Sequence, residues 1–392
     1  MTEPESQIRN ISNHFSNSFK TINDERLRVG WLCTYTPEEI ILSAGFSPTR
    51  ILGEDKGNKA EGYFPTNFCL YLKSSWESIL NDTNKLSAIV FVNSCDGMRR
   101  LYDTCKNYKP QTPSFMLDVP RINTDASLEH FSNNLFELAG FLGELKKSKI
   151  EFGTLKKSIE LVNGKRILLK KLNHYYNQFN GLVDNPDYFD ILKLSMISEP
   201  EIFVQDLHTY LGKITEEAAT IEIGYDGAVK TNYDSFEGSI PPRIMIIGNF
   251  INESKLWESF KELNCKIAFT DLCNSSRYYE GLVEDKGNAS KNNTIENLLG
   301  TIAARYLNKP QCMRMANLGI KLKEVKENII NNNIKGVIFF SMKFCDNTLL
   351  FYPLLRQHLG ETGVQSLFLE IEHNNFSEGQ IKTRIQAFLE IL

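Results

Sequence analysis

The chain has 392 residues, of which 42% are hydrophobic and 23% charged, a composition typical of globular proteins with two or three domains. Its formal net charge of −4 and its pI near 6.0 argue against general nucleic-acid binding. No apolar run approaches the roughly 18 residues of a membrane helix, and the first residues lack the pattern of a secretory signal. We therefore expect a cytoplasmic protein whose eight cysteines stay reduced and free to bind metal.

The order of apolar patterns along the chain predicts its domains. Residues 1–26 are polar with sparse apolar positions, which is typical of a peripheral arm or helix. Residues 27–125 alternate short strand-like runs with helical patterns, residues 126–240 are mainly helical, and the alternation returns in residues 241–392. The predicted fold class is α/β, with two similar Rossmann- or flavodoxin-like domains, each with a parallel sheet, and a helical segment between them.

Two strand-like runs end in the same way, on a cysteine followed by an aspartate. Residues 88–92 are uniformly apolar and lead to Cys95 and Asp96, and residues 336–340 lead to Cys345 and Asp346. Continuous apolar runs of this length are typical of strands buried on both faces of a parallel sheet. Each aspartate is predicted to cap a helix, so each cysteine is expected at a ligand-binding sheet edge, where free amides favour the thiolate.

Six of the eight cysteines are candidates for one shared site. A cysteine taken alone is most often a small buried apolar residue. Most of the six, however, follow strand-like or extended apolar segments, which favours a role as ligands. The six candidates, three in each half, are Cys33, Cys69 and Cys95, then Cys273, Cys312 and Cys345.

The spacing of these cysteines narrows the chemistry. Structural zinc sites favour close Cys-x-x-Cys pairs, of which the chain has none, and a disulfide framework does not suit the cytoplasm. An iron–sulfur cluster held by thiolates from separate loops fits better. Three thiolates could hold one cubane with an open iron, and six could hold two cubanes. Cys105 and Cys265 are expected to be structural, because each lies too far along its own element to share a site with its neighbour.

Charged residues in two segments leave alternatives open. The run from Thr36 through Pro37 to Glu38 and Glu39 is typical of a helix start, so the glutamates are expected to cap the helix, with proton donation beside a cluster as the alternative. Eight lysines crowd residues 146–171. They predict a solvated helix face or, alternatively, a docking patch for an acidic partner.

Several segments resemble the 2-hydroxyacyl-CoA dehydratase and benzoyl-CoA reductase family of iron–sulfur proteins. The resemblance covers roughly residues 28–390 and rests on the order and spacing of these segments. They are Cys33-Thr-Tyr-Thr-Pro-Glu-Glu-Ile40 with Ala44-Gly45, Phe64-Pro-Thr-Asn-Phe-Cys69, Asn93-Ser-Cys-Asp-Gly-Met-Arg-Arg-Leu-Tyr-Asp103, Val119-Pro-Arg121, Asn163-Gly-Lys-Arg-Ile-Leu-Leu169, Ala303-Ala-Arg-Tyr306 and Phe344-Cys-Asp346.

The resemblance implies a set of cluster ligands. Family members bind one [4Fe–4S] cluster through three cysteines, which match Cys69, Cys95 and Cys345, and they pair as two different subunits that act on acyl-CoA thioesters. With the additional cysteines Cys33, Cys273 and Cys312, this sequence looks more like the double-cubane cluster proteins. That similarity implies a homodimer in which six cysteines per subunit hold a double-cubane [8Fe–9S] cluster: Cys33, Cys69, Cys95, Cys273, Cys312 and Cys345.

The resemblance also implies a partner and a reaction. Both branches receive low-potential electrons from a separate ATP-hydrolysing [4Fe–4S] activator protein, and the absence of a P-loop motif here agrees with ATP hydrolysis on that partner. We expect an anaerobic oxidoreductase that reduces a small-molecule substrate. The alternative is a lyase, the [4Fe–4S] subunit of a 2-hydroxyacyl-CoA dehydratase. A third hypothesis is a non-enzymatic electron-relay or cluster-maturation protein.

Overall fold

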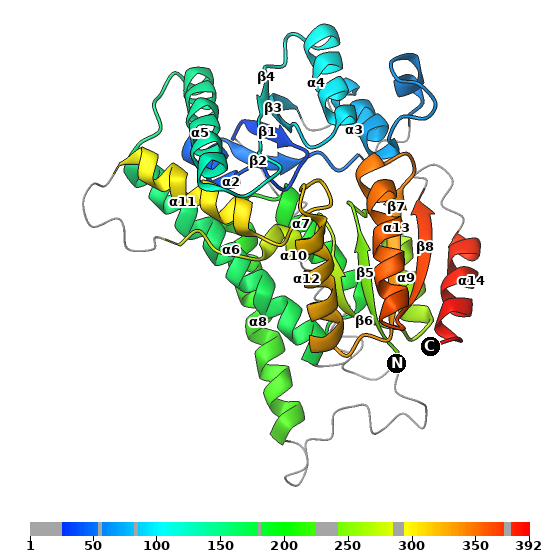
Figure 1. Cartoon of the computed structure of the whole chain (residues 1–392). Coiled ribbons are helices and arrows are strands. Elements are labelled where there is room, and N and C mark those ends of the chain that lie inside the picture. Colours follow the sequence, from blue (N-terminus) through cyan, green and yellow to red (C-terminus); the bar gives the residue numbers. More distant parts are fainter. Residues whose placement is uncertain are drawn as a thin grey trace.

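Two four-stranded, all-parallel sheets with helices around them form the protein (Figure 1). The structure is a computed structural model that describes residues 26–53, 57–81, 85–178, 182–223, 242–284, 294–371 and 378–392. The predicted fold class is confirmed: two α/β domains with parallel sheets and a helical segment. The predicted arm over residues 1–26 lies, except for its last residue, outside the described residues.

The first sheet has the strand order β2-β1-β3-β4. Its central strand β3 is apolar at successive positions and is buried from Ala88 to Val92, as expected for a strand covered on both faces. The strands are β1 (Arg28–Trp31), β2 (Ser47–Arg50), β3 (Leu86–Val92) and β4 (Ser114–Leu117). The connecting elements are α2 (Glu38–Ser43), the short 3-10 helix η1 (Lys59–Gly62), α3 (Leu70–Leu80) and α4 (Asp96–Tyr108).

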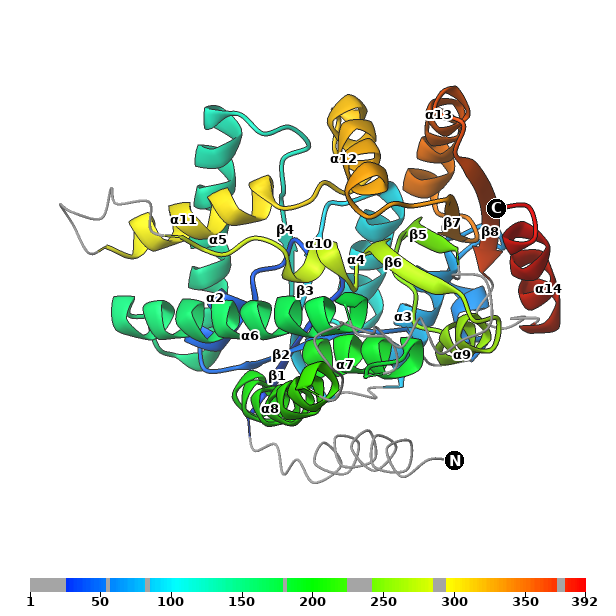
Figure 2. The ribbon, with the colours of Figure 1, turned by 90° about the horizontal axis from the view of Figure 1, so that it is seen from below.

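The second sheet repeats this order as β6-β5-β7-β8. Alternate residues of β5 enter two different apolar clusters, Ile244 on one face and Met245 on the other. Figure 2 shows α12 and α13 on one face of this sheet and α9 with α7 on the other. The strands are β5 (Arg243–Gly248), β6 (Lys266–Asp271), β7 (Gly336–Met342) and β8 (Gln365–Ile371), with helices α9 (Ser254–Glu262), α10 (Ser276–Tyr279), α12 (Leu318–Asn331), α13 (Asp346–Glu361) and α14 (Glu378–Leu389).

Long helices stand beside both sheets. They are α5 (Asp125–Lys146), α6 (Phe152–Gln178), α7 (Asn185–Ile197), α8 (Pro200–Ile223) and α11 (Ile295–Asn308). Although α11 comes after β6 in the chain, it packs against α5 and α6 (Figure 1). No helix among the described residues is both long and apolar enough to cross a membrane.

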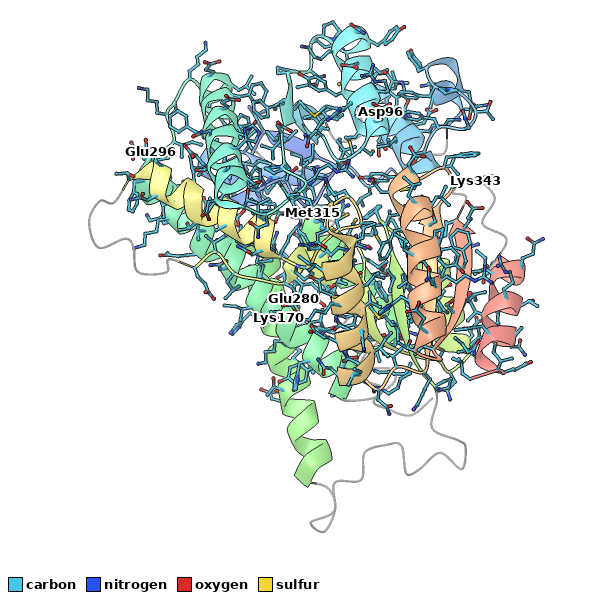
Figure 3. The ribbon with its side chains drawn as sticks, in the orientation of Figure 1. Asp96, Lys170, Glu280, Glu296, Met315 and Lys343 are labelled. Carbon is cyan, nitrogen blue, oxygen red and sulfur yellow. The ribbon has the colours of Figure 1, made fainter. Side chains whose placement is uncertain are left out.

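The carboxyl edges of the two sheets meet. The loop after β4 is joined to the segment before α12, because Ala316 N–H donates to the Arg121 carbonyl (2.8 Å) and Arg121 Nε donates to the Arg314 carbonyl (2.9 Å). Met315, labelled in Figure 3, lies in this segment and is buried. In doubly wound sheets of this order, ligands bind at the carboxyl edge where the chain direction of the crossovers reverses, here between β1 and β3 and between β5 and β7. The fold therefore brings two such positions together.

Candidate iron–sulfur site at the junction of the two sheets

Three of the predicted cysteines occupy equivalent positions immediately before helices. Cys69 is the N-cap of α3, Cys95 the N-cap of α4 and Cys345 the N-cap of α13. We call these three residues the first thiol group. The aspartates predicted as caps, Asp96 and Asp346, are instead the first helical residues, so the cysteines themselves stand at the helix starts.

The first thiol group is linked by thiol–thiol and thiol–amide interactions. A hydrogen bond between the Cys69 and Cys345 side chains raises the pKa of Cys69 and, together with donors from Thr348 and Asn249, lowers that of Cys345 to about 6. The Cys95 sulfur accepts a hydrogen bond from Met98 N–H at 3.4 Å, but burial still raises its pKa to about 11. The helix amides thus offset part of the cost of burying thiolates.

Two hydrogen bonds to backbone carbonyls join the domains at this group. Leu70 N–H donates to the Lys343 carbonyl at 3.4 Å, and Asn347 Nδ2 donates to the Ser94 carbonyl at 3.3 Å. Figure 3 labels Asp96, the first residue of α4, and Lys343, which follows β7. The first thiol group therefore combines two cysteines of the first domain with one of the second.

The other three cysteines form a second thiol group. Cys273 follows β6 and shares a hydrogen bond with Cys312, which lies between α11 and α12; this bond raises the pKa of Cys273 and lowers that of Cys312. Cys33 follows β1, and its charge acts on Lys309 together with the charges of this pair. Cys33 also contributes to the raised pKa of Cys95, so it lies within electrostatic range of the first thiol group. The second thiol group, Cys33, Cys273 and Cys312, likewise draws on both domains.

The sequence has three candidate cysteines in each half, and the structure groups them across the halves, with the three that the resemblance matches to one cluster in the same group. Cys345 joins the thiols of the first domain, and Cys33 lies toward those of the second. Half-buried side chains are common to all six. Among the described residues, no three or more His, Cys, Asp or Glu side chains could hold a single metal ion. Thiolates around a multi-iron cluster stand farther apart than ligands around one ion, so this finding concerns single-ion sites.

Cys105 and Cys265 lie apart from both groups. Cys105 is fully buried in the first domain, with its sulfur 3.4 Å from the Ser114 hydroxyl. Cys265 is buried in the second domain, where burial raises its pKa to about 12. Both side chains pack in the apolar core, as expected for structural cysteines.

Cations near the second thiol group were missed by the sequence analysis. Arg277 Nη1 lies 3.7 Å from the Cys273 sulfur and 3.5 Å from the Cys312 sulfur. Lys309 is buried, donates to the Thr34 carbonyl at 2.5 Å, and has a pKa that burial holds well below its ordinary value. Arg314 is also buried, two residues after Cys312. A usable signal was present: each of the three cations follows or precedes a candidate cysteine by no more than four residues.

The predicted capping role of the two glutamates is wrong. Helix α2 begins at Glu38. Within the described residues it has no side-chain cap, and the buried Thr36 hydroxyl has no hydrogen-bond partner there. Both glutamates are buried in ion pairs with α6: Glu38 with Lys165 at 2.7 Å and Glu39 with Arg166 at 2.8 Å. The solvated-face prediction for the lysines therefore fails at Lys165, whereas Lys170, labelled in Figure 3, is exposed and forms an ion pair with Glu280 of the neighbouring segment at 3.0 Å.

Comparisons with known proteins agree over nearly the whole chain. The family model of 2-hydroxyglutaryl-CoA dehydratase, D-component, matches residues 33–392. The (R)-phenyllactyl-CoA dehydratase beta subunit of Clostridium sporogenes is 24% identical over 370 residues, covering 93% of this chain and 91% of that protein. The beta subunit of lactoyl-CoA dehydratase of Anaerotignum propionicum is 24% identical (99% and 98% covered), and a subunit of the benzoyl-CoA reductase of Thauera aromatica is 24% identical (95% and 92% covered). The chain therefore belongs to the 2-hydroxyglutaryl-CoA dehydratase D-component family, within the wider group of 2-hydroxyacyl-CoA dehydratases and benzoyl-CoA reductases that the sequence resembles.

Proposed function

We propose that this protein is an iron–sulfur oxidoreductase that holds a double-cubane [8Fe–9S] cluster through Cys33, Cys69, Cys95, Cys273, Cys312 and Cys345. The observation that carries the proposal is that two groups of three thiols lie at the junction of the two sheets, close enough for Cys33 of one group to act electrostatically on Cys95 of the other. One group of three thiolates suffices for a single cubane, so a second group is the feature that a single-cluster protein does not need.

The donor set fits such a cofactor. The six thiols come from separate loops and helix starts, they are half-buried, and each group already contains one hydrogen-bonded thiol pair. Thiolates in a partly dry site are the usual ligands of iron–sulfur clusters. When bound, the cluster would supply low-potential electrons. The chain would hold it, screen it from water and balance its negative charge with helix amides and buried cations.

The same proposal includes partners and location. We propose a homodimer that receives electrons from a separate ATP-hydrolysing [4Fe–4S] activator and passes them to a small-molecule substrate in the cytoplasm. Its named relatives are subunits of dehydratases and of a reductase, which supports an enzyme that works with other chains. A reducing compartment would keep the thiols free for iron.

A second function is favoured by the names of several relatives. They are beta subunits of dehydratases for 2-hydroxyacyl-CoA thioesters, so this chain could be the [4Fe–4S] subunit of such a lyase. In that case the first thiol group alone would hold the cluster, and Cys33, Cys273 and Cys312 would be reduced bystanders. The two functions predict different iron contents.

Anaerobic purification with iron and sulfide analysis tests the proposal. The double-cubane predicts about eight irons per chain, and the lyase alternative about four. The variant C273A/C312A should reduce the iron content by about half if both groups bind iron. The matched control is C105A/C265A, which removes two buried thiols outside the groups and should leave the iron content unchanged. About four irons in the wild type, unaltered in C273A/C312A, would establish the single cluster.

A further inference from the structure

A buried arginine joins the second thiol group to the carboxyl edge of the second sheet. Arg277 is 1% exposed, and one nitrogen of its guanidinium, Nη1, faces both Cys273 and Cys312. The other end of the guanidinium donates to the Asp271 carbonyl (2.5 Å) and to the carbonyl of Gly248, and Nε lies 2.9 Å from the Asp271 carboxylate. A planar group fixed at so many points has little freedom to turn.

Arg277 and Lys321 are matched by the two carboxylates of Asp271 and Glu324, so the excess positive charge of this region comes from further buried arginines. Asp271 is shared, because its second oxygen lies 2.6 Å from Lys321, which also contacts Glu324 at 3.3 Å. Two further buried arginines donate to backbone carbonyls and, in the part of the chain that the structure describes, form no ion pair with a carboxylate. Arg50 donates to the Cys273 carbonyl at 2.9 Å, and Arg314 donates to the Val119 carbonyl at 2.6 Å. Buried cations of this kind require an anion nearby, and thiolates of the second group would supply it.

The two thiol groups are therefore stabilised by different means. Around Cys69, Cys95 and Cys345, the strongest influences on the thiols are burial, other thiols and neutral donors. Around Cys273 and Cys312 they include the full charges of Arg277, Arg50 and Arg314. Because a full charge in a buried site acts more strongly than a neutral donor, an added electron is more stable beside the second group.

Resting on the proposed function, we propose that Arg277 is a positioning residue: it orients Cys273 and Cys312 as ligands, and its charge gives the cluster half at the second thiol group a higher reduction potential than the half at the first. The reduction potential then rises from the first thiol group, at the starts of α3, α4 and α13, to the second. Electrons from the proposed activator would come to rest next to Arg277.

Substitutions at residue 277 separate its charge from its shape. R277Q removes the positive charge. R277K keeps the charge but lacks the planar guanidinium and its several fixed N–H donors. The matched control is R243Q, because Arg243 also donates to a backbone carbonyl (Asn332, 2.8 Å) but lies at the opposite end of β5. Iron per folded chain and midpoint potentials from electron paramagnetic resonance titrations are measured on anaerobically purified protein. R277Q should lower the iron content and shift the higher midpoint to a more negative value, R277K should lie closer to the wild type, and R243Q should match it.

A second variant keeps the test decisive if R277Q does not fold. C273A/C312A removes the thiols that Arg277 faces, so the cluster that remains should titrate at the lower of the two wild-type midpoints. A remaining midpoint equal to the higher one, or a folded R277Q with wild-type iron content and midpoints, would overturn the assignment of Arg277. A wild-type protein with about four irons or none would instead overturn the proposed double-cubane.

Discussion

Glu38 and Glu39 show how much of the structure depends on single buried charges. Tyr278 donates to Glu38 at 3.1 Å and Tyr306 to Glu39 at 3.0 Å, so each carboxylate has a phenol as well as a cation partner. The cations come from α6, and the phenols lie in α10 and α11. This pair of carboxylates thus ties the first domain to the helices beside both sheets.

Replacing Glu39 should destabilise the fold strongly. Glu39→Gln leaves the Arg166 guanidinium buried without its counter-charge, which typically costs about 3–5 kcal/mol. The matched control is Glu296→Gln in the first turn of α11, an exposed glutamate whose loss should cost about 0.3–1 kcal/mol through the helix dipole. Denaturant unfolding followed by circular dichroism measures both. Similar losses in the two variants would contradict a structural role of the buried ion pair.

The stabilising effect of Glu39 should depend on pH. Burial raises the pKa of Glu39, but the charges of Arg166 and Arg305 outweigh burial and hold the pKa below its ordinary value. A carboxylate with a depressed pKa stabilises the folded state above the pKa of the unfolded chain, about 4.3, and loses that contribution as the pH falls through the folded value. The difference in unfolding free energy between wild type and Glu39→Gln should therefore be constant near neutral pH and shrink below about pH 4.3. A difference that grows on acidification would show that Glu39 is not held as the anion.

At the residue scale, the sequence predicted the roles that depend on a residue's place in its own strand or helix. It did not predict the roles that depend on a partner far away in the chain. Cysteines after apolar strands could be placed at a sheet edge because the carboxyl ends of parallel strands share one edge. The burial of Glu38 could not be predicted, because Lys165, its partner, is 127 residues away and reads as one of many surface lysines. The local sequence pattern predicted a capping role for Glu38 and Glu39, and that prediction was wrong.

Strand β5 can approach β7 closely because it ends in a glycine. A Cβ atom on Gly248 would lie 2.5 Å from the backbone carbonyl oxygen of Phe340, which cannot move without disturbing β7. The Gly248 carbonyl also accepts a hydrogen bond from Arg277. The same glycine therefore lets β5 lie against β7 and accepts a hydrogen bond from the arginine that faces the second thiol group.

Gly248→Ala should separate the strands and destabilise the second domain. Overpacking of this kind typically costs about 1–3 kcal/mol. Gly212→Ala is the matched control, because Gly212 lies exposed inside α8 with open space around it and alanine there should stabilise by up to about 1 kcal/mol. Thermal unfolding distinguishes the variants: the melting temperature should fall for Gly248→Ala and should not fall for Gly212→Ala. A stabilised Gly248→Ala would mean that β5 and β7 can move apart freely.

At the element scale, the strands were easier to predict than the helix starts. Strand β3 extends over Leu86–Val92, close to the apolar run that predicted it. The helix after it was expected to be capped by Asp96, yet the preceding Cys95 occupies the cap position and uses its sulfur as the acceptor. Aspartate is the common cap, so a sequence pattern alone favours it.

The whole molecule is organised by the junction of its two sheets. The sequence predicted two α/β domains because each half alternates strands and helices, and that alternation is local. The local pattern could not predict that α11 packs against α5 and α6. It was the family resemblance that implied a common site for Cys69, Cys95 and Cys345, and the position of Cys33 near Cys273 and Cys312 was not predicted. These arrangements depend on how domains pack, which leaves no periodic pattern in either half.

If the proposed cluster is bound, its removal should weaken the attachment of the domains to each other. A cofactor bound to thiols of both domains stabilises only the assembled state, so anaerobic chelation should lower the melting temperature of the wild type. The variant C69A/C345A, which lacks two thiols of the first group, should show a much smaller change on chelation. Anaerobic differential scanning calorimetry measures both proteins. An unchanged melting temperature after complete iron removal from the wild type would contradict this coupling.

The crossed arrangement of the cysteines also constrains biosynthesis. Cys345 follows β7 and Cys312 precedes α12, so a nascent chain that has emerged only through α10 presents Cys33, Cys69, Cys95 and Cys273 but neither complete trio. Iron delivered at that moment would not find a complete set of three cysteine ligands. For the proposed cluster, assembly would follow translation of the second domain, because neither trio is complete before Cys312 and Cys345 have been added to the chain.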